Sequence, residues 1–176
     1  MKMKIASGVL AVTAIFGANA ANAFDGTINF TGLLTATTCA VTAATKNQSV
    51  TLPTLSTASM TVASPTSGLT QFKIDITGCT GPSNLFRAYF ESANNIDSTN
   101  GMVKNTGSAT NVALRLMNLD NSFIDASKPE LTQATAGGPI ASGVGSVSYR
   151  VGYHSAAGNA TAGTVAGVAN YSIRYN

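Results

Sequence analysis

The 176-residue chain is poor in charge, has one histidine and lacks tryptophan, and these shortages narrow the functions open to it. Charged residues make up 10% of the sequence, against about 25% in an average soluble domain. Without Lys2 and Lys4, the ten basic residues become eight against seven acidic ones, so no basic face for nucleic acid is expected. Two cysteines and one histidine are too few for a metal centre, and no cofactor is expected.

Residues that could support catalysis are also scarce. His154 is the only histidine and lies next to Tyr153 at the expected end of a strand, where a surface role is the simpler interpretation. No serine sits in a G-x-S-x-G elbow, and no helix pattern follows the glycines at 143 and 145 to form a phosphate loop. The sequence therefore predicts a protein that is not an enzyme and has no catalytic residues.

The first 23 residues have the pattern of a secretory signal peptide. Lys2 and Lys4 precede an apolar run over 5–18, which is too short to span a bilayer. Two A-x-A sites follow, at 18–20 and 21–23. Cleavage after Ala23 is preferred, because a strand pattern starts at the next residue, and cleavage after Ala20 is the alternative. The sequence therefore predicts an exported mature chain with no later membrane span.

Cys39 and Cys79 are the only cysteines, and the predicted export takes them to an oxidising compartment. One disulfide between them is the expected state. In the chain-entropy model, closing a loop of this size stabilises the fold by roughly 4 kcal/mol.

Alternating apolar and polar residues recur along the rest of the chain, with no convincing helical period. Turn-rich connectors separate these runs, among them Gly81-Pro82-Ser83 and Gly137-Gly138-Pro139. Several short strands with frequent turns predict one all-β sandwich or barrel domain. The expected strands contain Phe72, Ile74 and Ile76; Leu85 to Phe90; Val112, Leu114 and Leu116; Val147, Tyr149, Val151 and Tyr153; and Ala169, Tyr171, Ile173 and Tyr175.

Both ends of the mature chain have a strand pattern. The opening places six residues on one strand face, namely Phe24, Gly26, Ile28, Phe30, Gly32 and Leu34. The far end alternates up to Tyr175, with Asn176 as the last residue. Taken alone, these patterns also fit an ordinary first strand and an ordinary core strand.

Three groups of residues together resemble the type 1 fimbrial major subunit family of chaperone–usher pilins. The first is the opening G-x-I-x-F-x-G from Gly26 to Gly32, and the second is Cys39 followed by F-K-I-D-I-T-G-C over residues 72–79. The third is the ending, with penultimate Tyr175 and with Gly163 as the fourteenth residue from the end. The resemblance covers the whole mature chain.

This resemblance implies an incomplete immunoglobulin-like β-sandwich that lacks one strand and is completed by a donor strand from a neighbouring subunit. It implies a donor extension over residues 24–36 and a pilin domain over 37–176. A periplasmic chaperone is expected to fill the gap first and to recognise the strand that borders it, and exchange for the next subunit then follows at an outer-membrane usher. The residues expected in that chaperone-recognised strand are Gly163, Ala169, Tyr171, Ile173, Tyr175 and Asn176.

The resulting hypothesis is a major shaft subunit of a surface fimbrium, polymerising by donor-strand exchange and supporting cell adhesion. A minor or adaptor subunit of the same system would use the same two ends. A self-contained secreted sandwich that binds carbohydrate is a further alternative. Such modules usually stack sugars on exposed aromatic residues, and this chain has no tryptophan.

Overall fold

The computed structural model describes residues 28–32, 34, 36–63 and 66–176. Residues 34–176 form one compact unit, and residues 28–32 belong to a separate one. The predicted signal peptide, Phe24 and Gly26 lie outside the described residues. Among the residues that are described, no helix is long and apolar enough to cross a membrane.

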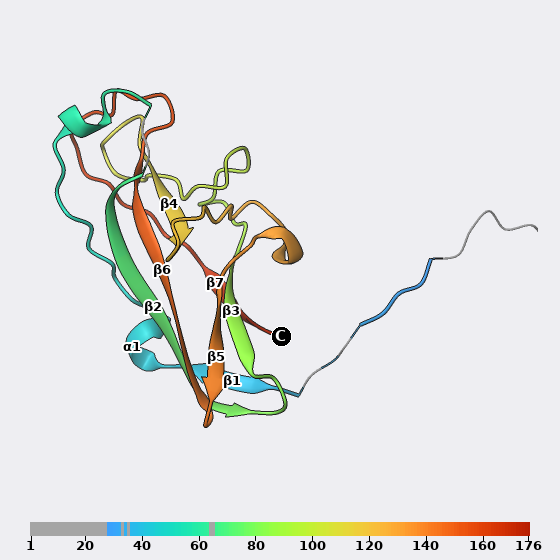
Figure 1. Cartoon of the computed structure of the whole chain (residues 1–176). Helices are drawn as coiled ribbons and strands as arrows, with labels where there is room; N and C mark the ends of the chain where they lie inside the picture. The colour runs from blue at the N-terminus through green and yellow to red at the C-terminus, as the bar shows by residue number, and fades with distance from the viewer. Residues whose placement is uncertain (1–27, 33, 35, 64–65) are drawn as a thin grey trace, which may run out of the picture. The chain divides into compact units, whose positions relative to one another are not determined.

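The regular secondary structure of the larger unit consists mainly of antiparallel strands, joined by long loops (Figure 1). Its helical parts are a four-residue α1 (Ala43–Lys46) and two short 3-10 turns, at Thr57–Met60 and Glu130–Thr132. The strands are β1 (Thr38–Val41), β2 (Ser67–Thr80), β3 (Leu85–Phe90), β4 (Ala113–Asn118), β5 (Gly137–Ala141), β6 (Val144–His154) and β7 (Tyr171–Tyr175).

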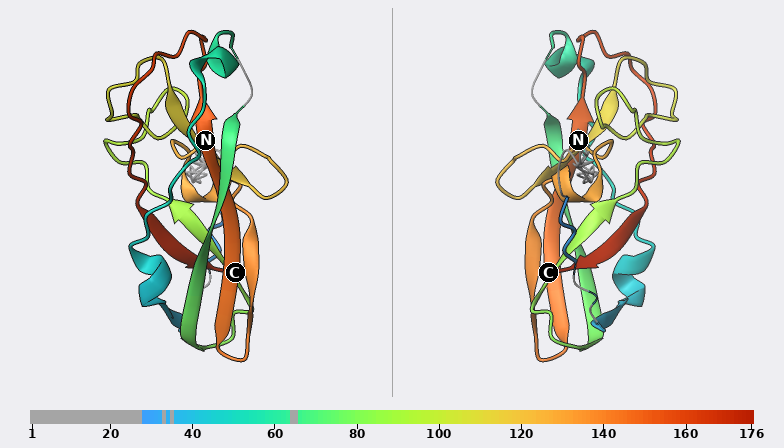
Figure 2. Two further views of the ribbon diagram at one scale, coloured as in Figure 1. Left: turned by 90° about the vertical axis from the view of Figure 1, so that its left-hand side faces the viewer. Right: turned by 90° about the vertical axis from the view of Figure 1, so that its right-hand side faces the viewer.

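The strands follow the order β1-β2-β6-β5-β3-β7, and β4 pairs with the part of β6 beyond β5, from Tyr149 to His154. Strand β5 carries the sheet from one layer to the other, because Ile140 and Ala141 pair with β6 while residues 137–139 pair with β3. Figure 2 shows the long β2 and β6 side by side, with β3 and β7 on the other side of the curl. The sheet remains open, since β1 and β7 stand at its two ends.

Strand alternation places the predicted apolar residues in the core. Ile74 and Ile76 of β2 and Phe86 and Phe90 of β3 are buried, while their polar neighbours face outward or are half-buried. Tyr149 of β6 is also buried, and its ring lies edge-on to Phe90 at 5.4 Å between centroids. The strands expected from the alternation pattern are therefore present.

One local expectation was wrong. Gly137-Gly138-Pro139, predicted as a connector, forms the first part of β5. A Cβ on Gly138 would lie 2.3 Å from the Ser146 carbonyl oxygen, so glycine permits the close approach to β6. Glycine here marks a tight strand contact rather than a turn.

Candidate functional site

The candidate site is a groove between two chain segments that lie beside the open edges of the sheet. The first segment, residues 47–55, is called here the N-terminal rim, and the second, residues 161–170, the C-terminal rim. The hollow between them has a volume of about 750 Å³. A second hollow of about 480 Å³ continues it, and Val165 lines both.

The groove floor is apolar. It is formed by core side chains from four strands and one loop, namely Phe72, Phe90, Val103, Leu114, Leu116 and Val151. Among the residues that line the larger hollow, Lys46 is the only charged one. An occupant with apolar side chains is therefore favoured over a charged or strongly polar one.

The N-terminal rim has no backbone partner of its own. Within the described part of the chain, no hydrogen bond involves the backbone groups of residues 49–55. This segment nevertheless borders the core, and Val50 and Leu52 pack against it. The rim therefore behaves as a strand whose neighbour is missing.

The C-terminal rim is paired along one side only. The carbonyls of Thr164, Ala166 and Asn170 accept hydrogen bonds from backbone amides of adjacent segments of the same chain. Their alternates, Val165, Gly167 and Ala169, make no backbone hydrogen bond to any residue that the structure describes. Alternation of this kind is expected for a strand with one paired edge and one free edge.

Gly163 and Gly167 lie on this rim because the chain passes close to its neighbours there. A Cβ on Gly163 would stand 2.5 Å from the Ala109 backbone nitrogen. A Cβ on Gly167 would stand 2.9 Å from the side chains of Leu114 and Val103 on the groove floor. Glycine is thus required at 163 and 167 by close local contacts, which leaves the predicted role of Gly163 in chaperone recognition untested.

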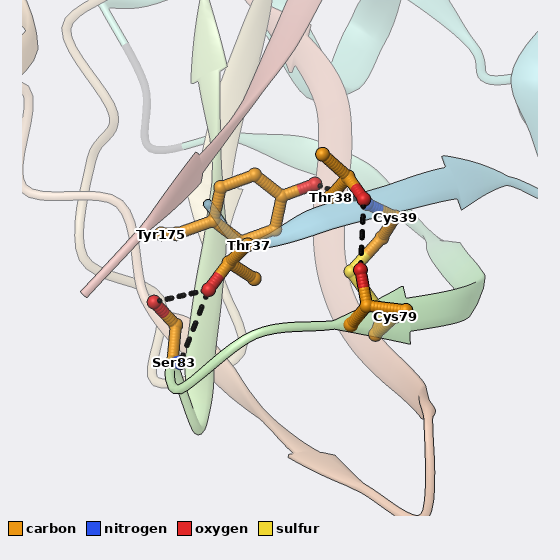
Figure 3. Close-up of a disulfide and its surroundings, with 7 residues drawn as sticks. Thr37, Thr38, Cys39, Cys79, Ser83 and Tyr175 are labelled. Atoms are coloured by element: carbon orange, nitrogen blue, oxygen red, sulfur yellow. Dashed lines mark hydrogen bonds between the residues drawn. A yellow bond between two sulfur atoms is a disulfide. The ribbon is translucent and has the colours of Figure 1, made fainter. Parts of the chain in front are cut away.

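The predicted disulfide joins Cys39 of β1 to Cys79 of β2. It fixes the short edge strand β1 to the long strand β2 (Figure 3). Nearby, the hydroxyl of Tyr175 accepts a hydrogen bond from the Cys39 amide at 3.0 Å. The C-terminal strand and the disulfide therefore meet at one end of the groove.

The remaining residues of the predicted ending form strand β7 and the rim before it. Tyr171, Ile173 and Tyr175 are partly buried against the core, and Ala169 lines the groove. Burial raises the pKa of the Tyr171 hydroxyl, whose proton is donated to the Thr45 carbonyl at 3.2 Å. The Asn176 amide donates to the Leu85 carbonyl, so β7 pairs with β3 up to the end of the sequence.

In the opening segment, the described apolar side chains are exposed. Ile28, Phe30 and Leu34 are 78%, 89% and 100% exposed. A Cβ on Gly32 would meet nothing within 4 Å. Three large apolar side chains left in water so close together are typical of a segment that is buried elsewhere.

Sequence reasoning did not identify the N-terminal rim. The available signal was the alternation of Val50 and Leu52 with Ser49 and Thr51, which ends at Pro53. That pattern predicts a strand, and only the sheet order reveals that this strand has no neighbour. The hydroxyl contacts of Tyr171 and Tyr175 were likewise outside the reach of sequence pattern.

Comparison with known proteins supports a fimbrial assignment. A family model described as "Fimbrial protein" matches residues 23–176. The F17 fimbrial protein of Escherichia coli is 37% identical over 95% of this chain and 96% of its own length. The major fimbrial subunit SMF-1 of Stenotrophomonas maltophilia (strain K279a) is 35% identical over 89% of this chain and 96% of its own length.

Solved structures show the same fold at low sequence identity. The P pilus rod subunit PapA matches with a TM-score of 0.58 and 16% identity, over 78% of this chain and 99% of PapA. A subunit from the structure of a chaperone–usher pilus, determined to explain rod uncoiling, matches with a TM-score of 0.60 and 16% identity. That match covers 87% of this chain and 96% of the other.

The open antiparallel sheet and these matches confirm the predicted incomplete immunoglobulin-like β-sandwich. The family match over residues 23–176 and the two fimbrial relatives favour a fimbrial subunit over the alternative of a carbohydrate-binding module. The chain belongs to the fimbrial protein family and is a non-enzymatic structural subunit of a surface fimbria.

Proposed function

We propose that the groove is an acceptor site for the N-terminal segment, residues 24–34, of a second copy of this chain, and that the protein is a major shaft subunit. One observation carries this proposal: two rims with free backbone groups enclose an apolar floor, while the chain's own Ile28, Phe30 and Leu34 stay exposed. A groove and an insert at different places on one chain give head-to-tail filaments.

The chemistry of the two surfaces is complementary. An added strand would pair its backbone with the free groups of the rims and direct every second side chain to the floor. Burial of four large anchors, Phe24, Ile28, Phe30 and Leu34, would supply on the order of 6–12 kcal/mol before ordering costs. A slip by one residue would direct Thr27, Asn29 and Thr31 to the apolar floor, so the register is well defined.

The empty groove needs a temporary cover before assembly. Free strand edges beside an apolar floor are a template for aggregation. A periplasmic chaperone that lends its own strand fits this need, with β7 and the C-terminal rim as the neighbouring strand and the Asn176 carboxylate as an anchor. The outer-membrane usher would then be the place of exchange.

The test is deletion of residues 24–34 from the mature chain, produced with its chaperone. We expect the chaperone complex to form and filaments seen by negative-stain electron microscopy to be lost. A matched pair sharpens the result: Phe30→Asp, on the inserted face, should abolish filaments, while Asn29→Asp, on the outer face, should leave them. Filaments of normal yield from the deletion would contradict the proposal.

A minor or adaptor subunit is the second candidate, because it would use the same groove and the same segment. The 35% identity to a major fimbrial subunit favours the shaft role. Immunogold labelling separates the two: labels along the whole filament support a shaft subunit, and labels at the tip alone support an adaptor.

A further inference from the structure

The end of the groove next to β1 is closed by side chains. At this end the two edges of the open sheet approach each other, yet β1 and β7 share no backbone ladder. The Tyr175 hydroxyl accepts the Cys39 N–H at 3.0 Å, as Figure 3 shows. The Tyr171 hydroxyl donates to the Thr45 carbonyl at 3.2 Å, on the far side of the same gap.

The Tyr175 hydroxyl occupies a position that an added strand would otherwise use. The pairing of β1 with β2 shifts register between Thr38 and Ala40, and the Cys39 N–H points to the Tyr175 hydroxyl instead of to β2. An added strand would offer a carbonyl to that N–H, and Tyr175 offers its hydroxyl oxygen instead. Thr45 lies in helix α1, and its carbonyl accepts hydrogen bonds from the Tyr171 hydroxyl and from the Gln48 side-chain amide, both at 3.2 Å.

In the core of the same chain, side chains also bond the backbone groups of an unpaired strand edge. Where β5 no longer pairs with β3, the Tyr149 hydroxyl accepts the Ala88 N–H at 3.0 Å and donates to the Ala136 carbonyl at 2.8 Å. Next to it, the Gln133 amide bonds both backbone groups of Phe90, at 2.7 and 2.8 Å. Side chains there complete a strand edge that has no neighbouring strand, and no further strand is added.

The opposite end of the groove is closed by the backbone. The Ala160 N–H donates to the Met60 carbonyl at 3.3 Å, and the Asn159 N–H donates to the Thr61 carbonyl at 3.1 Å. These bonds join the segment that follows the N-terminal rim to the segment that precedes the C-terminal rim. The groove is therefore a slot with two ends, and its N-terminal rim spans nine residues, 47–55, or about 30 Å of extended chain.

We infer that Tyr175 is a positioning residue that ends strand addition on the β1 side of the slot. Its hydroxyl satisfies the Cys39 N–H of the edge strand, and Tyr171 ties β7 to helix α1 beside it, so an inserted strand pairs with the rims and stops before the disulfide. The inference rests on the proposed function. It assigns Tyr175 a role inside the assembled subunit, separate from recognition by a chaperone.

The test compares filaments of the wild-type mature chain with filaments of Tyr175→Phe and of Tyr89→Phe. Hydrogen exchange of the Cys39 amide is read by mass spectrometry after a reducing quench. Loss of one neutral hydrogen bond should make Cys39 exchange about tenfold faster in Tyr175→Phe. Tyr89→Phe is the matched control, because the Tyr89 hydroxyl has no hydrogen bond within the described residues.

Unchanged exchange at Cys39 in Tyr175→Phe filaments would overturn the inference, since the inserted strand itself would then hold that N–H. If Tyr175→Phe does not assemble, cryo-electron microscopy of wild-type filaments decides: a Tyr175 hydroxyl on the Cys39 N–H supports the inference, and a donor-strand carbonyl there overturns it. Failure of the wild-type chain to assemble through residues 24–34 would contradict the proposed function instead.

Discussion

Two pairs of extended segments in this molecule differ in their backbone hydrogen bonding. Strands β2 and β6 are joined by a ladder, whereas no hydrogen bond of the described residues joins the two rims of the groove to each other. The ladder joins nine residue pairs, from Ser67 with Tyr153 to Thr77 with Val144. The rims face each other across an apolar floor, and neither uses its inner backbone groups within the described residues. One half of the molecule is thus complete, and the other half lacks a strand.

The two halves share one core. The Phe72 ring lies 6.4 Å from Phe90 and 5.9 Å from Tyr149, and Phe72 and Phe90 also line the groove. An inserted strand would therefore cover side chains that the ladder half already holds in place. Only the strand itself is missing, because contacts within the core already hold the side chains of the groove floor in place.

Removing the disulfide should have the largest effect, because Cys39–Cys79 joins the edge strand of the incomplete half to the ladder. With both cysteines changed to alanine, we expect a loss of about 4 kcal/mol in the free energy of unfolding. Urea unfolding of the subunit, with its groove filled by a synthetic peptide of residues 24–34, measures this loss. A change below about 1 kcal/mol would show that β1 is held without the disulfide.

Two glycines test whether the incomplete half adapts more easily than the ladder half. Gly138→Ala places a Cβ 2.3 Å from the Ser146 carbonyl in a paired strand, and we expect a cost of about 3 kcal/mol. Gly167→Ala meets the ends of the Leu114 and Val103 side chains at 2.9 Å, which can move, and we expect about 1 kcal/mol. The same urea experiment ranks them, and a reversed order would break the comparison.

The smallest effect concerns His154, at the end of β6 in the ladder half. Burial, with Arg115 close by, lowers the pKa of this imidazole below its ordinary value of 6.5, and its buried Nδ1 has no hydrogen-bond partner in the described structure. The unfolded chain therefore binds a proton more readily. Stability should be full above pH 6.5 and fall as the pH drops toward the lowered pKa.

His154→Gln should remove this part of the pH dependence. Thermal unfolding of the peptide-filled subunit between pH 7.5 and pH 5 measures it in both proteins, over roughly the range where histidine titrates. Equal slopes in the wild type and the variant would show that carboxylates, and not His154, set the dependence.

The sequence predicted most strands because each has its own alternating pattern. Phe72, Ile74 and Ile76 indicate β2, and Val147, Tyr149 and Val151 indicate β6, whatever their neighbours are. Gly137-Gly138-Pro139 was misinterpreted because glycine serves both turns and close strand contacts, and only the distance to Ser146 separates the two. The N-terminal rim was missed because the sequence of a segment does not show whether another strand pairs with it.

By itself the sequence determined the class of fold, the cysteine pair and an opening segment whose apolar face begins at Phe24 and continues to Leu34. These depend on local alternation and on residue type, which any single segment carries. Tertiary structure alone decided which edge stays open and how Tyr171 and Tyr175 close one end of the groove. The reason is physical: the Thr45 carbonyl and the Tyr171 hydroxyl are 126 residues apart in the chain, the Cys39 N–H and the Tyr175 hydroxyl are 136 apart, and only folding brings each pair within hydrogen-bond distance.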